Sequence, residues 1–312
     1  MGNAFLYRAA RPAPALLIGL TFAVLVLGVF PAVEWVTTGN EGTLRLFFDY
    51  IGALWLIALS LAELGFCLLA RAQFSPGEPL RRVWSLASLG AAAHAVGSIL
   101  SQALGIPGGL NPFAGNAGWP AAAAREWGLT IGGPLQMIFL ASALAFALKT
   151  YRRSGLLPRI RPADWALLAV VAGFAVWQIY EVVLYWGPNK TGNFHEAITV
   201  ITDPLLCLLL AEAILIRRSV LNMGWGLTGL CWSAFTAAIF LTSVGNIGLW
   251  LTTNFALPRA LEASTWYVWF LVYAAYALAP AYQVEACRRA VRPLVLPLKP
   301  ALVSRALMPC MT

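Results

Sequence analysis

The amino-acid sequence predicts an all-α integral membrane protein with eight transmembrane helices. Of its 312 residues, 60% are hydrophobic and only 11% are charged, whereas a soluble domain has about 25% charged residues. The apolar residues form long runs, separated by segments too short to bury a core of their own. The runs are about 20 residues long, which indicates helices, because strands of a membrane barrel need about 9–11 residues of alternating polarity.

Eight runs qualify as membrane-spanning helices. In chain order they are 13–35, 46–70, 83–104, 128–148, 163–186, 197–216, 226–251 and 265–284. The first run follows Arg8 and Arg11, as a signal peptide would. It is too long for one, however, and no small-residue cleavage pattern follows it, so we expect a retained signal-anchor helix. The connections between runs are short, except for the Gly- and Pro-rich segment 105–127 after the third run.

The positive charges predict the orientation of these helices. If the N-terminus is cytoplasmic, 17 of the 21 Lys and Arg residues fall in cytoplasmic segments and 4 in outer segments. Such a bias sets the topology of membrane proteins, so both termini are expected in the cytoplasm of a bacterial inner membrane. It also accounts for the net charge of +8 without a nucleic-acid partner. The expected partner is the lipid bilayer.

Two short motifs that recur in the second half of the sequence indicate an internal repeat. The motif Leu61-Ala62-Glu63 returns as Leu210-Ala211-Glu212, and Val96-Gly97-Ser98-Ile99 resembles Val244-Gly245-Asn246-Ile247, at offsets of 149 and 148. The matches fall in the second and third helix of each half. We therefore expect two parallel four-helix halves, 1–150 and 151–285, followed by a basic cytoplasmic tail, 286–312.

Carboxylates inside the runs are the first candidates for function, because a charge near the bilayer centre costs about 2.5–3.5 kcal/mol. Five qualify: Asp49, Glu63, Glu181, Asp203 and Glu212. Asp49 and Asp203 lie within two turns of an outer helix end, which suits an acid at the headgroup level. Glu63, Glu181 and Glu212 lie deeper, and no Lys or Arg lies deep in any run.

Three chemistries are open for these deeper acids. Each can be a protonated hydrogen-bond donor, a binding group for a proton or cation in transit, or the partner of an arginine at the cytoplasmic face. For Glu212 the arginine is near, since Arg217 and Arg218 follow within two turns. For Glu63 it is remote, because Arg71 lies eight residues, or about 12 Å, further along the helix.

His94 lies nearest the membrane midplane, with Ser98 one turn away on the same face. It can ligate a haem or chlorin, relay protons, or hydrogen-bond a neighbouring helix, and we favour the last role. The other histidine, His195, lies in an outer segment, which disfavours a bis-histidine haem. Gln136 and Gln178 add neutral polar groups to their helices. The five cysteines form no C-x-x-C pair, so neither a metal site nor a disulfide is expected.

No catalytic motif is present, which favours a non-enzymatic protein, and the sequence assigns no cofactor. The preferred interpretation is a multi-pass membrane protein with a small-molecule or ion site between its helices, operating as a proton-coupled transporter. The site candidates are Glu63, His94, Glu181 and Glu212. The alternative is a sensory or accessory subunit that acts through a protein partner.

Overall fold

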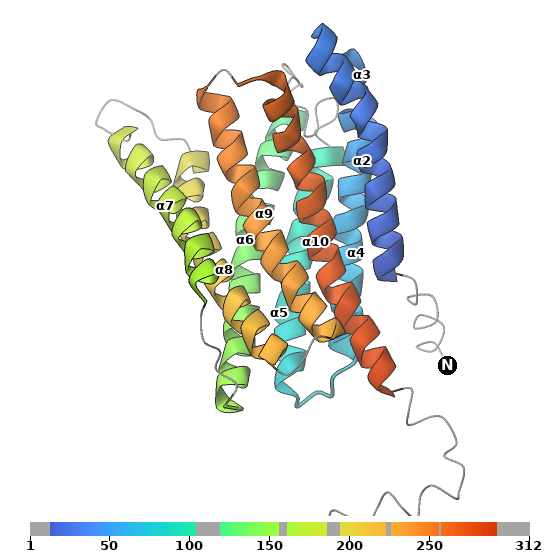
Figure 1. Cartoon of the computed structure of the whole chain (residues 1–312), viewed down its shortest axis with the longest axis vertical. Coiled ribbons are helices and arrows are strands. Elements are labelled where there is room, and N and C mark those ends of the chain that lie inside the picture. The colour runs from blue at the N-terminus through green and yellow to red at the C-terminus, as the bar shows by residue number, and fades with distance from the viewer. Residues whose placement is uncertain are drawn as a thin grey trace, which may run out of the picture.

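The computed structural model describes residues 13–103, 119–155, 161–185, 194–222, 226–255 and 257–291. These residues are helical and form a bundle whose successive helices run in alternating directions (Figure 1). The elements are α2 (Ala13–Thr38), α3 (Gly42–Leu46), the π-helix η1 (Phe47–Gly52), α4 (Ala53–Ala72), α5 (Pro79–Ser98), the π-helix η2 (Ile99–Ala103), α6 (Trp119–Arg153), α7 (Pro162–Tyr185), α8 (Phe194–Asn222), α9 (Leu227–Asn254) and α10 (Arg259–Val291). Because α3, η1 and α4 are continuous, the described residues contain eight long helices.

Five helical stretches are long and apolar enough to cross a membrane. They are Ala13–Thr38, Gly42–Ala72, Pro79–Gln102, Gly132–Arg153 and Leu227–Thr252. They support the prediction of a multi-pass helical membrane protein. Among the described residues α7 has a shorter apolar stretch, α8 carries several charges, and α10 is rich in Trp and Tyr. The crossing of the membrane by all eight helices stays a prediction.

The outer faces of the bundle suit a lipid environment. On α2, Phe22 and Phe30 are 67% and 72% exposed. On α7, Val176 and Tyr180 are exposed as well. A soluble protein seldom presents so much contiguous apolar surface, whereas lipid chains solvate it well. α2 and α7 are therefore helices with one face on the bundle and the rest turned toward the bilayer.

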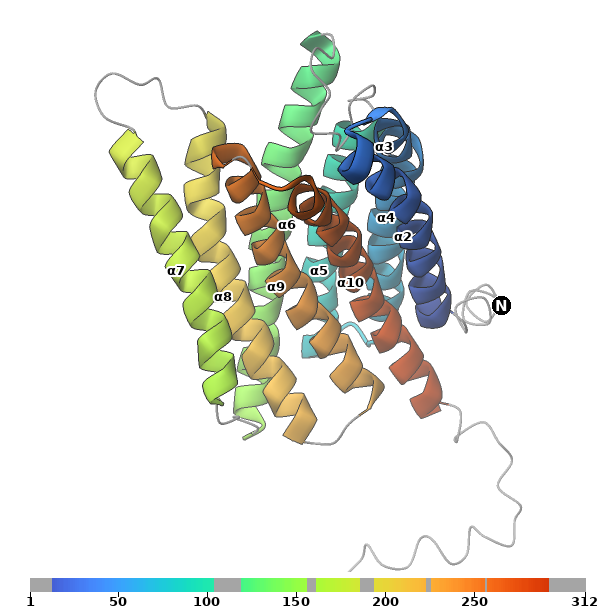
Figure 2. The ribbon, with the colours of Figure 1, turned by 45° about the horizontal axis from the view of Figure 1, so that its top comes forward.

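Six helices contact one another in a closed circuit: α4 packs on α5, α5 on α6, α6 on α8, α8 on α9, α9 on α10, and α10 on α4. The remaining two pack outside this circuit, α2 on α10 and α7 on α8. They lie at opposite sides of the bundle, as Figures 1 and 2 show. Each of the six inner helices therefore has two inner neighbours.

Glycines bring α5 and α6 unusually close. A Cβ atom added at Gly97 would lie 2.7 Å from the carbonyl oxygen of Gly128 and 3.0 Å from the Cα of Gly132. One added at Gly90 would lie 3.0 Å from the carbonyl oxygen of Gln136. Only small residues allow such backbone contact between membrane helices. Because His94 lies between Gly90 and Gly97 on α5, these contacts place it against α6.

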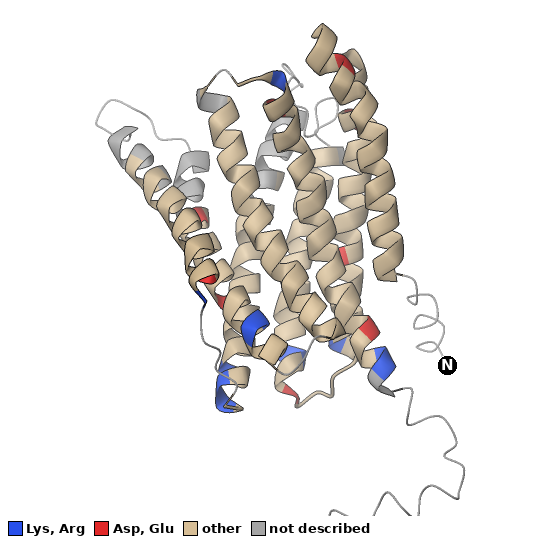
Figure 3. Ribbon diagram, in the orientation of Figure 1, with Lys and Arg blue, Asp and Glu red and all other residues tan. Residues whose placement is uncertain are grey.

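The basic side chains gather at one end of the bundle, where α4, α6, α8 and α10 end and α5 and α7 begin (Figure 3). Among the described residues, Arg45 and Arg259 are at the opposite end. Such a separation is typical of the positive-inside distribution. The end with most of the arginines is the one that the sequence assigns to the cytoplasm, and that assignment stays a prediction.

Candidate functional site

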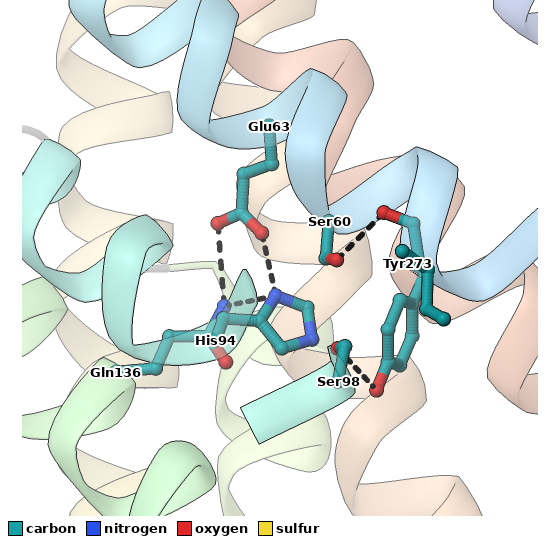
Figure 4. Close-up of polar contacts among 7 residues, drawn as sticks. Ser60, Glu63, His94, Ser98, Gln136 and Tyr273 are labelled. Atoms are coloured by element: carbon teal, nitrogen blue, oxygen red, sulfur yellow. Dashed lines mark hydrogen bonds and ion pairs between the residues drawn. The ribbon is translucent and has the colours of Figure 1, made fainter. Parts of the chain in front are cut away.

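Glu63 and His94 form a buried acid–imidazole pair between α4 and α5. Oε2 of Glu63 lies 2.6 Å from Nδ1 of His94 (Figure 4). The two residues are 3% and 7% exposed. Glu63 lies on the buried face of α4, one turn from Leu59 and Cys67. The partner of Glu63 is thus an imidazole rather than Arg71, and His94 makes the helix-to-helix hydrogen bond that the sequence favoured.

Gln136 adds a third helix to this pair. Its Nε2 lies 3.2 Å from Oε1 of Glu63 and 3.1 Å from Nδ1 of His94. It is 6% exposed and lies one turn after Gly132, whose contact with α5 brings the amide to this depth. Each carboxylate oxygen of Glu63 therefore has a donor, one from α5 and one from α6 (Figure 4).

The short contact fixes where the protons can be. A distance of 2.6 Å between Nδ1 of His94 and Oε2 of Glu63 requires a proton between the two atoms. Nδ1 has a single lone pair in the ring plane and cannot accept from both Glu63 and Gln136. The hydrogen-bond network therefore favours Nδ1–H as a donor to an ionised Glu63, with Gln136 donating to the other oxygen.

Two tyrosines of α10 cover the imidazole. The ring centroids of His94 and Tyr273 are 4.4 Å apart, and those of His94 and Tyr276 are 6.1 Å apart. Ser98, one turn after His94, donates to the hydroxyl of Tyr273 at 3.3 Å (Figure 4). Both tyrosines interact electrostatically with Glu63.

Nε2 of His94 has no hydrogen-bond partner among the residues that the structure describes. A carboxylate on Nδ1 fixes the imidazole in the tautomer that leaves the lone pair on Nε2. That arrangement leaves Nε2 as the ring nitrogen of His94 that has no partner in the described part of the chain. The remaining members of the site hold the ring in place: Glu63 and Gln136 at one edge, and the aromatic rings of α10 at its side.

The sequence did not identify Tyr273 and Tyr276. They lie in an aromatic-rich run of α10, and their spacing of three residues places them on one helix face. That spacing was a usable signal, but the identity of the partner helix could not be predicted, because α10 and α5 belong to distant parts of the chain. The hydrogen bond between Ser98 and Tyr273 spans 175 residues.

The other predicted site residues do not join this cluster in the described residues. Glu212 is 8% exposed on α8, and Arg217 and Arg218 do not pair with it. Arg217 donates to Ser233 at 3.0 Å, and Arg218 donates to Asp164 at 2.7 and 2.8 Å. Oε2 of Glu212 has no hydrogen-bond partner within the described part of the chain. The arginine partner considered for Glu212 is therefore wrong.

Some predicted residues lie outside the described set. The side chain of Glu181 is among them, as are those of Gln178 and His195. Among the described residues, no group of three or more His, Cys, Asp and Glu side chains could hold a metal ion. Four cysteines are described, and each is a free thiol: Cys67, Cys207, Cys231 and Cys287.

Comparison with family models, with curated proteins and with solved structures finds no match to this chain.

Proposed function

We propose that this chain is a proton-coupled membrane carrier in which the Glu63–His94 pair binds the proton. The observation that supports this function is the buried contact of 2.6 Å between an acid and an imidazole, with no Lys or Arg of the described residues hydrogen-bonded to either one. Ionisable side chains within membrane helices are costly and are kept where they carry ions or protons. The protein is not proposed to be an enzyme, because the cluster contains no activated nucleophile.

The net charge of the pair explains how proton binding can be coupled to another event. With one proton on Nε2 and one on Nδ1, the imidazolium neutralises the carboxylate of Glu63. When Nε2 of His94 releases its proton, the pair is left with one negative charge. A net charge is costly in an apolar interior, so loss of the proton favours a compensating cation, a solute, or a conformation that admits water. Proton binding and one of these events are then linked.

The six inner helices support the proposed parallel repeat, with halves 1–150 and 151–285, whereas the outer helices α2 and α7 depart from it, since α2 packs on α10 and α7 packs on α8. Exchanging the halves replaces α4, α5 and α6 by α8, α9 and α10, and the contacts α4–α5 and α5–α6 have counterparts in α8–α9 and α9–α10. The contacts between halves, α6–α8 and α10–α4, then correspond to each other. Under this proposal both termini are cytoplasmic, and Glu63 corresponds to Glu212.

The pH dependence of thermal stability tests the pair. If the pair takes up and releases a proton, the melting temperature of the purified protein should depend on pH. Glu63→Gln keeps the size of the side chain but removes its charge, and we expect it to flatten this dependence while the protein still inserts. Glu41→Gln is the matched control, because Glu41 is a half-buried acid that pairs with Arg45 away from the cluster. An unchanged pH profile in Glu63→Gln would contradict the proposal.

Transport itself requires a second measurement. Liposomes containing the protein and an internal pH dye are exposed in turn to amino acids, sugars, organic acids and organic cations. We expect one solute class to drive proton movement, and Glu63→Gln to reduce its rate at least tenfold. The rate in Glu41→Gln should match that of the natural protein. Solute movement that is equal in Glu63→Gln would show that this pair does not carry the coupling proton.

The alternative, a sensory or accessory subunit, is supported by how tightly the cluster is packed. Glu63, His94 and Gln136 are each less than a tenth exposed, as expected of side chains that fasten three helices together. Such a subunit would copurify with a protein partner in fixed ratio. No proton movement with any solute, together with such a partner, would favour this function over the carrier.

A further inference from the structure

Asp203 is a second acid buried in the bundle, away from Glu63. It is 3% exposed on α8, and its Oδ1 accepts from Nδ2 of Asn246 on α9 at 3.4 Å. Its Oδ2 is buried and has no hydrogen-bond partner among the described residues. The sequence placed Asp203 at the headgroup level because it lies near an outer helix end. The structure adds that this side chain is enclosed between helices and that, among the described residues, one of its carboxylate oxygens has no donor.

Pro204 frees one backbone acceptor near Asp203. A proline within a helix has no N–H, so the carbonyl four residues earlier, that of Val200, loses its donor. Asp203 is three residues after Val200 and therefore lies on the same side of α8. In an apolar bundle each such acceptor needs a donor. A proton on Asp203 supplies one, because the neutral acid has an O–H that can donate.

The charged groups around Asp203 do not offer a counter-ion. α9 contains no Asp, Glu, Lys, Arg or His. The charged side chains described on α6 and α7, including Lys149 and Asp164, lie at the inner end, and Tyr180 is the titratable group described further out on α7. On α8 itself, the thiol of Cys207 interacts with Asp203 one turn away. Within the described residues, an ionised Asp203 therefore has an amide for a partner and no cation.

Asn246 can serve both charge states of Asp203. Its amide nitrogen donates to an ionised carboxylate, and its amide oxygen can accept from a protonated one after rotation of the side chain. Asn246 also follows Thr242 by one turn on α9, and Thr242 lies close to Tyr276 while its hydroxyl donates to the carbonyl oxygen of Ala238. Tyr276 in turn lies against His94. Polar groups thus extend from Asp203 to the imidazole of the first site.

We propose that Asp203, held by Asn246, is a second proton-binding site of this protein, in the half of the chain that follows the Glu63 site. The neutral acid satisfies the buried acceptors, and the ionised acid requires compensation. This site is independent of the proposed carrier function, because its proton can be detected without any transported solute. Its position on α8 and α9 also gives the second half a proton site of its own.

Infrared difference spectroscopy on the full chain in lipid nanodiscs detects such a proton directly. A protonated carboxyl has a C=O stretch that is separate from the carboxylate bands and shifts in heavy water. We expect the difference between acidic and alkaline samples to contain one such band that Asp203→Asn removes. Asn resembles the neutral acid in size, so the variant should fold. Asp164→Asn is the matched control, because the bidentate contact with Arg218 keeps Asp164 ionised.

Further variants separate this site from the first one. Asn246→Leu should move the Asp203 band to the frequency of a weaker hydrogen bond and shift the pH at which it appears. Glu63→Gln should leave the Asp203 band in place, so failure at one site does not imply failure at the other. The proposal is overturned if the protonated-carboxyl bands are the same in Asp203→Asn as in the natural protein. If Asp203→Asn does not fold, insensitivity of every such band to Asn246→Leu overturns it.

Discussion

Acidic residues in this bundle have different partners at different depths. At the arginine-rich end of the bundle, Asp164 and Glu285 pair with arginines, Asp164 with Arg218 and Glu285 with Arg288 and Arg289. Further inside, Glu63 has an imidazole and Asp203 has an amide. An arginine keeps a carboxylate ionised, whereas an imidazole or amide leaves the proton free to move between states. The pairs with arginine are thus suited to stabilising the fold, and those of Glu63 and Asp203 to binding a proton.

Glu285 is the acid on which the stabilising role of an arginine pair can be tested. Burial favours its neutral form, but the hydrogen bonds and charges of Arg289 and Arg288 outweigh burial, so its pKa lies below the ordinary value. A lowered pKa stabilises the fold at pH values above the unfolded-state pKa of about 4.3, and this contribution disappears as the pH falls through the folded-state pKa.

We expect Glu285→Gln to lower the melting temperature at neutral pH, and the difference from the natural protein to close below about pH 4. Thermal melting at a series of pH values measures it. Glu41→Gln should have a small effect throughout, because the side chains of Glu41 and Arg45 are 36% and 41% exposed. A difference that stays constant into acid would mean that the charge of Glu285 does not matter to the fold.

Among the elements, α5 and α6 approach each other backbone to backbone, so side-chain size matters at single positions of both helices. The backbones of Gly97, Gly128 and Gly132 are in contact, so a methyl group has no room there. At Gly133, one residue further along α6, an added Cβ meets nothing within 4 Å. The two faces of one helix thus respond differently to the same small change.

We expect Gly97→Ala to destabilise the bundle by about 1–3 kcal/mol, the usual range for overpacking. Gly133→Ala should be neutral or slightly stabilising, since Ala has the higher helix propensity. Thermal melting in detergent compares the two. Gly97→Ala should also weaken the contacts between Gln136 and the Glu63–His94 pair, which flattens the pH dependence of melting. Equal melting temperatures for the two variants would contradict the close contact of α5 and α6.

The sequence predicted individual elements better than their mutual contacts. The apolar runs gave the helices, and the cost of burying charge gave Glu63 and His94 as candidates. Their hydrogen bond to each other was not predictable, because it depends on how α4 and α5 are rotated about their axes, and Gly90 and Gly97 determine that rotation for α5. The π-helices η1 and η2 were missed for a similar reason, since an extra residue within a turn leaves the apolar pattern unchanged.

For the whole molecule, the distribution of basic residues is the feature with a direct test. The described Lys and Arg lie almost entirely at one end of the bundle (Figure 3). If this end is cytoplasmic, both chain termini are cytoplasmic as well. We expect a fluorescent protein fused to either terminus to fluoresce, and alkaline phosphatase at the same positions to be inactive. A fluorescent fusion in the outer segment 105–127 should be dark. Active phosphatase at either terminus would reverse the topology.

The closeness of α5 and α6 has a consequence for how the molecule can deform. Two helices whose backbones are in contact resist sliding past each other. We therefore expect α5 and α6 to move as one rigid unit that carries His94 and Gln136 together. Within the circuit of six helices, sliding is then easier where two helices meet through side chains alone, as α4 and α10 do. Tyr273 and Tyr276 approach His94 from α10, so such sliding would change how the imidazole is covered and leave its contact with Gln136 intact. Tilting of α10 would thus cover or uncover the Glu63–His94 pair.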